Sequence, residues 1–507
     1  MTSSPLWMAL RRSCYSRGFA ALLGGVLCAA GYAPLDAWPL PLFSLGLLFA
    51  LLQGRSWRQG ALLGGLFGIG LFATGISWVH VSINNFGGLP LVASLALMAL
   101  LVLYLALFPA LVGTITALAR IHQPLAFGGS WLLSEWLRGW LFTGFPWLEL
   151  GASQLDAPWA GFLAWGGASG LGLLMALSAA AAVRAWYNPR YALVPAICGV
   201  LTILLANISL LKPRPEQVPV ALVQGNVQQI LRWDPEARDQ ILATYRRLQQ
   251  QTTGARLVVW PEAAVPVAES GALAYLAGID YLARSQQSAL ITGIVDYKAA
   301  SQQFYNNLIV LGGGDTPPYF YGHANRYSKH HLLPIGEFVP LGDLLRPLAP
   351  LFNLPMSDFS RGAYVQRNLQ AAGLNVLPAL CYEIAFAQQM RANLTPETDL
   401  LLTVSNDAWF GRSHGPAQHN DLARLRAIEL GRPLVRATNT GITSAYDAKG
   451  HELGRLPQFE EGILRVELPL VSGLTAYSRM GDWPALLLAG LALLAAFRWF
   501  KVPAVRG

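Results

Sequence analysis

Two different hydrophobic patterns divide the chain. Long apolar segments with few charges fill residues 1–211 and recur after Trp483, whereas residues 212–481 alternate short apolar runs with polar breaks. A membrane-spanning helix needs about 20 mostly apolar residues, while a buried strand needs only a few. The pattern therefore predicts transmembrane helices in 1–211, an extracytoplasmic α/β domain in 212–481, and a last span with a cytoplasmic tail in 482–507.

The long apolar segments predict an α-helical transmembrane bundle of about eight spans. The first two segments are short and suit tilted or partly re-entrant helices, and Pro34, Pro39 and Pro41 break the chain between them. The candidate spans are residues 18–33, 40–53, 60–80, 90–118, 125–144, 160–183, 191–211 and 483–499.

The placement of lysine and arginine predicts how the bundle is oriented. Basic residues are enriched in cytoplasmic loops, and here they alternate with loops that have none, 34–39 and 81–89. This alternation predicts that both termini are cytoplasmic and that the globular domain lies outside. The basic residues on the predicted cytoplasmic side are Arg11, Arg12, Arg17, Arg55, Arg58, Arg120, Arg184, Arg190, Arg498, Lys501 and Arg506.

One arginine departs from this alternation. Arg138 lies close to Glu135 within the fifth candidate span. Two interpretations stay open: a structural pair near a helix end, or a contact with a lipid headgroup, because ionisable residues inside membranes tend to be functional.

The short apolar runs of the globular part predict a layered α/β domain. They are rich in β-branched residues, and helix-like stretches at 235–250 and 417–430 lie between them. A hairpin with Gly450 in its turn is predicted near 445–453. The predicted strands are VPVALVQ, RLVVW, ALITGIV, NNLIVLG, NVLPALCY, DLLLTVSN and PLVRATNTG.

Composition agrees with this division. Hydrophobic residues make up 53% of the 507 residues and charged residues 13%, about half of the charged share that is usual in soluble proteins. The net charge of +8 comes without a basic run and aromatic signature, so nucleic-acid binding is not expected. Of the four cysteines, only Cys381 lies in the globular part, which therefore cannot contain an internal disulfide.

Several predicted strands are followed by reactive side chains. Glu262 follows RLVVW, Cys381 follows VLPAL, and Asn406 and Asp407 follow LLLTVS. Ligands of α/β sheets gather at the carboxyl ends of strands, so these residues are expected to meet. The loop-like segment 326–340 adds Lys329 and Glu337.

Cys381, Glu262 and Lys329 together would supply a nucleophile, a general base and a cation for an oxyanion. Taken singly, each has a plainer interpretation: a buried structural cysteine, a glutamate that caps a helix, and a solvated lysine. Other chemistries lack support. The pair His330 and His331 has no metal-site spacing around it, so no metal is expected, and neither a phosphate-binding loop nor a serine-hydrolase elbow occurs.

Four motifs in order resemble the nitrilase superfamily. They are WPE at 260–262, YSKHHLLPIGEFVP at 327–340, CYE at 381–383 and SNDAWFG at 405–411. With the apolar segments on either side, nearly the whole chain resembles the bacterial apolipoprotein N-acyltransferase family. The resemblance implies an αββα nitrilase-like sandwich in which Glu262, Lys329 and Cys381 form the catalytic triad.

The resemblance also implies further site residues. Glu337, Tyr382, Glu383 and Asn307 match supporting positions, although the adjacent Asn306 leaves the register of Asn307 open. Trp233, Trp409 and Phe410 match aromatic residues at the active-site entrance. The family usually has phenylalanine where this chain has Ile335, an apolar exchange that casts little doubt on the activity.

The activity that the resemblance implies is N-acylation of an apolipoprotein. An acyl chain would pass from a membrane phospholipid, typically phosphatidylethanolamine, to Cys381 as a thioester. It would then pass to the α-amino group of an N-terminal diacylglyceryl-cysteine, the last step of bacterial lipoprotein maturation. The expected location is the bacterial inner membrane with a periplasmic catalytic domain, and no cofactor is expected.

Three alternatives remain open from the residues alone. A membrane-tethered nitrilase-type amidase would share the triad but would hydrolyse its substrate. A transporter with an accessory domain would be expected to show internal repeats and charged residues at the membrane midplane. A non-enzymatic scaffold for lipoproteins would not need the thiol of Cys381.

Overall fold

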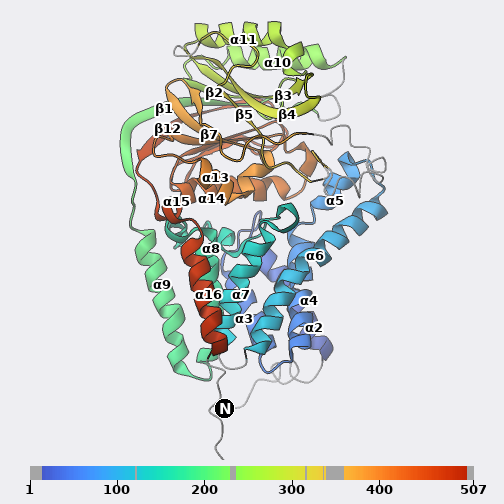
Figure 1. Ribbon diagram of the computed structural model, residues 1–507, viewed down its shortest axis with the longest axis vertical. Coiled ribbons are helices and arrows are strands. Elements are labelled where there is room, and N and C mark those ends of the chain that lie inside the picture. The colour runs from blue at the N-terminus through green and yellow to red at the C-terminus, as the bar shows by residue number, and fades with distance from the viewer. Residues whose placement is uncertain are drawn as a thin grey trace, which may run out of the picture. The chain divides into compact units, whose positions relative to one another are not determined.

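The structure, a computed structural model, describes residues 14–119, 123–228, 236–313, 317–334, 336–338 and 359–498 (Figure 1). The fold divides into two compact units. The first comprises Met1–His80, Pro90–Ser209 and Arg479–Gly507, and the second comprises Val81–Leu89 and Leu210–Ser478. The segment Val81–Leu89, which the sequence places between two apolar spans, thus belongs to the same unit as the α/β domain.

The first unit is helical, as predicted. Among the described residues, three helical stretches are long and apolar enough to cross a membrane, Leu91–Leu118, Ala160–Ala185 and Pro189–Ala206, and Trp57–Gly75 with Val79–Asn85 would be a fourth, bent by 56°. The number of spans, about eight, therefore stays a prediction. The helices are α2 (Cys14–Ala29), α3 (Pro39–Leu52), α4 (Trp57–Gly75), α5 (Val79–Val81), α6 (Leu91–Leu118), α7 (Gln123–Arg138), α8 (Leu163–Ala185), α9 (Leu193–Ala206) and α16 (Trp483–Arg498).

Helices α4 and α6 pack closely because glycines line their contact. Gly60 and Gly64 stand one turn apart on α4, where a Cβ atom would lie 2.3 Å from the carbonyl oxygen of Gly113 and 2.1 Å from that of Pro109, respectively. Small residues at this spacing let two helix backbones approach each other in an apolar environment.

Neighbouring glycines of α4 allow a direct test of this packing. We expect Gly64→Ala to lower the free energy of unfolding by about 1–3 kcal/mol, the usual cost of overpacking, since the new methyl group meets backbone. Gly65→Ala is the matched control, because its Cβ would make an ordinary 3.7 Å contact with Ala110. Thermal unfolding in detergent compares the two variants, and equal melting temperatures would contradict the close packing.

Glu135 and Arg138 at the end of α7 hold the segment that follows this helix. Glu135 Oε1 accepts hydrogen bonds from the Leu150 backbone N–H at 2.9 Å and from Trp131 Nε1 at 3.0 Å. Arg138 Nη1 donates to the carbonyl oxygen of Phe145 at 2.8 Å. Both charged residues are buried. Of the two interpretations of this pair, these contacts favour the structural one, acting through backbone groups.

The second unit contains two six-stranded sheets, with strand orders β12-β1-β2-β3-β4-β5 and β11-β10-β9-β8-β7-β6. The strands of the first sheet are β1 (Lys212–Gln224), β2 (Leu257–Val259), β3 (Ala289–Lys298), β4 (Gln303–Gly312), β5 (Arg326–Ser328) and β12 (Gly462–Ser472). Those of the second sheet are β6 (Leu369–Ala371), β7 (Leu374–Leu380), β8 (Leu400–Ser405), β9 (Leu434–Thr438), β10 (Ser444–Tyr446) and β11 (Glu452–Arg455).

The two sheets pack face to face through one hydrophobic core. Alternate residues of β1 and β2, such as Leu222 and Val259, share this core with residues of the second sheet, such as Leu402 and Val435. The intervening positions of β1 and β2 face the helices instead: Val258 packs in a second core with residues of α10 (Arg238–Gln250) and α11 (Leu273–Ser285). This alternation follows from the two-residue period of a strand.

Helices cover the outer faces of both sheets, which gives the four layers of an αββα sandwich (Figure 1). The helices beside the second sheet are α13 (Ala387–Asn393) and α14 (Gly415–Leu430), and α15 (Ala476–Met480) follows β12.

The predicted hairpin is confirmed, since β10 and β11 pair antiparallel and Gly450 adopts φ +79° in the connection. The predicted α/β domain is therefore confirmed.

Candidate active site

The predicted nucleophile follows directly on strand β7 in a strained backbone conformation. Cys381 has φ +53°, and the chain continues from it into a 3₁₀ turn, Cys381–Ala385. A residue other than glycine with positive φ costs about 1–3 kcal/mol and tends to occur at functional sites. Because β7 and β8 are parallel, the residues that follow them share one edge of the sheet.

Glu262, which follows β2, is buried and hydrogen-bonded through both carboxylate oxygens. Its Oε1 accepts from Asn306 Nδ2 at 2.8 Å, and its Oε2 accepts from the Asn406 backbone N–H at 3.2 Å. The ammonium of Lys329 lies 3.7 Å from Oε1. These contacts fix the carboxylate beside a cation.

Lys329 follows β5 and is only 1% exposed. Its Nζ contacts both carboxylate oxygens of Glu337 at 2.8 Å. Burial lowers the pKa of the Lys329 ammonium, but the carboxylates of Glu337 and Glu262 outweigh burial and raise this pKa above its ordinary value. Lys329 is therefore a permanently charged, buried cation between two glutamates.

The charges of Glu262 and Lys329 both affect the pKa of the Cys381 thiol. Burial and the carboxylate of Glu262 raise the pKa of this thiol above its ordinary value, and they outweigh the lowering effect of the Lys329 ammonium. The resting thiol is thus protonated at neutral pH and needs a base to become a thiolate. The structure brings the three predicted catalytic residues into one electrostatically coupled group, and their roles in the reaction stay predictions.

The hydrogen bonds favour Asn306 rather than Asn307 as the polar neighbour of this group. Asn306 Nδ2 donates to Glu262 Oε1 at 2.8 Å and to Glu337 Oε1 at 3.2 Å, and so bridges the two carboxylates. Asn307 is the next residue of β4, so its side chain points to the opposite face of the sheet. The contacts therefore favour Asn306 for the predicted supporting role, which stays a prediction.

Glu383 organises the loop that carries Lys329. Its Oε1 accepts from the backbone N–H groups of His330 at 2.8 Å and His331 at 3.0 Å, and its Oε2 accepts from the N–H of Leu380 at 2.9 Å. The hydroxyl of Tyr327 donates to the same carboxylate at 3.0 Å. Glu383 thus joins the nucleophile's turn to the start of the 326–340 segment.

The aromatic residues predicted near the entrance differ in exposure. Tyr382 is buried, and its ring packs edge-on against Phe386 with centroids 5.1 Å apart. Trp409 is 36% exposed, and its carbonyl oxygen accepts from Ser82 Oγ at 2.8 Å. The segment Val81–Leu89 therefore contacts the loop after β8. Trp233 and Ile335 lie outside the described residues.

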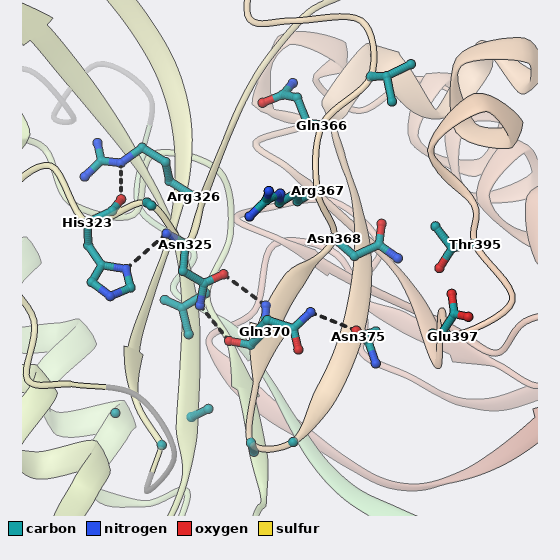
Figure 2. Close-up of a pocket in the computed structure, with 18 residues that line it drawn as sticks. His323, Asn325, Arg326, Gln366, Arg367, Asn368, Gln370, Asn375, Thr395 and Glu397 are labelled. Atoms are coloured by element: carbon teal, nitrogen blue, oxygen red, sulfur yellow. Dashed lines mark hydrogen bonds between the residues drawn. The ribbon is translucent and has the colours of Figure 1, made fainter.

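A separate groove of about 920 Å³ lies where the edges of the two sheets meet (Figure 2). Asn325 and Gln370 hydrogen-bond in both directions across it, at 2.7 and 3.0 Å, and tie the segment before β5 to β6. The residues that line this groove include Arg326 and Arg367 but none of the three predicted catalytic residues. The groove therefore has no evident part in the chemistry of Cys381.

A half-buried cysteine beside a buried glutamate and a buried lysine, in a two-sheet α/β domain, is the arrangement expected of a cysteine enzyme of the carbon–nitrogen hydrolase type. Residues 219–475 match the family model described as carbon-nitrogen hydrolase, and residues 24–181 match the model described as apolipoprotein N-acyltransferase N-terminal domain. The chain belongs to the apolipoprotein N-acyltransferase family and is an acyltransferase.

Its relatives match it nearly from end to end. A protein of Photobacterium profundum named apolipoprotein N-acyltransferase is 46% identical, and the match covers 94% of this chain and 93% of the relative. Proteins of the same name from Vibrio cholerae and Azotobacter vinelandii are 46% and 42% identical, with coverage of 95% and 94% of this chain and 97% and 93% of the relatives. This membership favours an enzyme over the transporter and scaffold alternatives.

Proposed function

We propose that this acyltransferase moves an acyl chain from a membrane phospholipid, typically phosphatidylethanolamine, to the α-amino group of an N-terminal diacylglyceryl-cysteine of an apolipoprotein. A thioester on Cys381 links the two half-reactions. The observation that carries the proposal is the Lys329 ammonium 3.7 Å from the buried Glu262 carboxylate, in the same site as the Cys381 thiol. Family membership supplies the class of acceptor.

In the first half-reaction, Glu262 accepts the thiol proton as sulfur attacks the ester carbonyl carbon. The ammonium of Lys329 and nearby backbone N–H groups stabilise the tetrahedral oxyanion, an arrangement that is worth most in a water-poor site. The carbon–oxygen bond to the glycerol then breaks. Glu262 returns the proton to the leaving oxygen, so the products are a lysophospholipid and the Cys381 thioester.

In the second half-reaction, the neutral α-amine of the acceptor attacks the thioester carbonyl. Glu262 removes a proton from the attacking nitrogen, and Lys329 again stabilises the oxyanion. The carbon–sulfur bond breaks, and Glu262 gives its proton to sulfur. The products are the amide and the original thiol, so no oxidant, reductant or cofactor takes part.

The proposed setting is the bacterial inner membrane. About eight spans would hold the chain there, with both termini cytoplasmic and the catalytic domain periplasmic. The alternation of basic and uncharged loops supports this orientation. Both proposed substrates are lipids whose reacting groups lie near the headgroup level, which explains why an acyl-transfer domain is joined to apolar helices.

A chase experiment distinguishes this transferase from a hydrolase with the same triad. The full-length enzyme in detergent is first mixed with phosphatidylethanolamine, and a synthetic diacylglyceryl-cysteine peptide is then added. We expect the acyl chain to appear on the amine of the peptide, with little free fatty acid in the absence of peptide. Release of fatty acid at the same rate with and without peptide would support the hydrolase and contradict the proposal.

A further inference from the structure

A buried polar cluster lies at the carboxyl ends of β8 and β9, beside Cys381. The carboxylate of Asp407 accepts from Ser405 Oγ at 2.6 Å and from Arg436 Nη2 at 2.6 Å, and it lies 3.0 Å from His419 Nδ1. All four residues are buried, and none of them is more than 2% exposed. Burying a charge is costly unless it is paired. The charges of Asp407 and Arg436 compensate each other.

His419, on α14, connects this cluster to the backbone of Cys381. Burial and the Arg436 guanidinium lower the pKa of the His419 imidazole, while the Asp407 carboxylate, 3.0 Å from Nδ1, raises it. Its Nε2 lies 3.0 Å from the carbonyl oxygen of Cys381, which can only accept a hydrogen bond. Nε2 therefore carries a hydrogen and donates it to this carbonyl oxygen, while Nδ1 lies 3.0 Å from both Asp407 Oδ1 and Arg436 Nη2.

Ser405 connects the same cluster to the sulfur of Cys381. Its Oγ lies 3.2 Å from Cys381 Sγ and 2.6 Å from Asp407 Oδ1. A hydroxyl group has one proton, and the shorter contact to a carboxylate takes it. Once Glu262 has removed the thiol proton, the hydroxyl of Ser405 can rotate and donate to the thiolate.

The two contacts explain how a strained nucleophile keeps its conformation. At φ +53°, Cys381 retains its backbone geometry only if the surrounding structure fixes it. His419 holds the carbonyl oxygen of Cys381, and Ser405 holds the side chain. The Asp407 carboxylate and the Arg436 guanidinium in turn fix Ser405 and His419.

We propose that Asp407, His419 and Arg436 form a positioning cluster that aims the sulfur of Cys381 at the acyl carbonyl, with Ser405 as the contact to sulfur. This inference rests on the proposed role of Cys381 as the acyl acceptor. The cluster touches neither substrate in the proposed reaction. It acts through the nucleophile.

His419→Ala in the full-length enzyme tests the cluster. We expect single-turnover acylation by phosphatidylethanolamine to slow by about 10–100-fold at saturating lipid, because small misplacements of a reacting atom are costly. The lipid concentration for half-maximal rate should change little. His419→Gln keeps an N–H donor and should recover most of the rate.

Asn420→Ala is the matched control. Asn420 follows His419 on α14, is equally buried, and hydrogen-bonds to Tyr446 and Ser444 rather than to the cluster. We expect it to lower the melting temperature about as much as His419→Ala, yet to be acylated at the wild-type rate per folded molecule. Equal slowing of both variants, or no slowing of His419→Ala, would overturn the inference.

Alkylation by iodoacetamide separates the cluster from the proposed function, since it needs no lipid. The thiol is faced by Glu262, Lys329, Asp407 and Ser405. The Ser405 hydrogen bond lowers the pKa of the thiol. The alkylation rate is measured on the tryptic peptide 368–391, which contains Cys381. In Ser405→Ala, this rate should therefore begin to rise at a higher pH than in the wild-type enzyme. An unchanged pH profile would contradict the contact between Ser405 and the thiol. A wild-type enzyme that is alkylated but never acylated would instead contradict the proposed function.

Discussion

Replacing Cys381 by serine is expected to abolish acyl transfer and to leave no acyl group on the protein. A serine hydroxyl is a far weaker nucleophile than a thiol unless a dedicated base activates it, and loss of a nucleophile costs at least about 10⁴-fold in rate. Glu262 would have to remove a proton from a much weaker acid in a buried site. Single-turnover formation of lysophospholipid by the purified variant measures this loss.

The exchange of sulfur for oxygen changes little else, so the variant should remain folded. Cys198→Ser in α9 is a suitable control, since Cys198 is a free cysteine outside the candidate site. We expect this control to retain the wild-type rate. Acyl transfer by Cys381→Ser within tenfold of the wild-type enzyme would place the nucleophile elsewhere.

Lys329→Met is expected to slow acyl-enzyme formation by about 10²–10³-fold, the usual effect of removing one group that stabilises an oxyanion. Methionine fills the volume of the lysine stem without its charge. The variant also leaves the carboxylates of Glu262 and Glu337 without the cation that lies between them. Breaking a buried pair in this way costs about 3–5 kcal/mol of stability, so a loss of activity alone would be ambiguous.

The double variant Lys329→Met with Glu337→Gln removes this ambiguity. It takes away one of the two carboxylates that Lys329 contacts, so the melting temperature should recover towards that of the wild-type enzyme. The rate should stay low, because the oxyanion still lacks its cation. Recovery of rate together with stability would show that Lys329 acts only in folding.

The long-range pairing of the sheets could be predicted only where the hydrophobic pattern is strong. The run DLLLTVSN predicts a buried strand, and the structure has β8 at Leu400–Ser405. By contrast, β5 and β6 have three residues each and alternate with polar residues. Their pairing partners, rather than their own sequences, make them strands, and no local pattern indicates this.

The candidate site shows the same limit. Glu262 and Cys381 could be expected to meet because both follow the carboxyl ends of buried strands, although β2 and β7 belong to different sheets. The choice between Asn306 and Asn307 could not be made, since a shift of one residue reverses the face of a strand and both residues suit the pattern. The hydrogen bonds from Asn306 to both glutamates favour Asn306.

His419 shows what sequence patterns miss altogether. It lies in the predicted helix 417–430, where a histidine is unremarkable, and 38 residues separate it from Cys381. Only the folded structure brings its ring to the carbonyl oxygen of the nucleophile. The preceding motif SNDAWFG was a signal for Ser405 and Asp407, but nothing in it indicates that they contact sulfur and histidine.

The mass of the Cys381 peptide after exposure to lipid tests the central claim most directly. Full-length enzyme is mixed with phosphatidylethanolamine in the absence of any amine acceptor, digested at low pH to preserve thioesters, and measured by mass spectrometry. We predict a gain of one acyl group on Cys381, released by hydroxylamine. An unmodified Cys381 alongside turnover of the lipid, or an acyl group on another residue, would contradict the account.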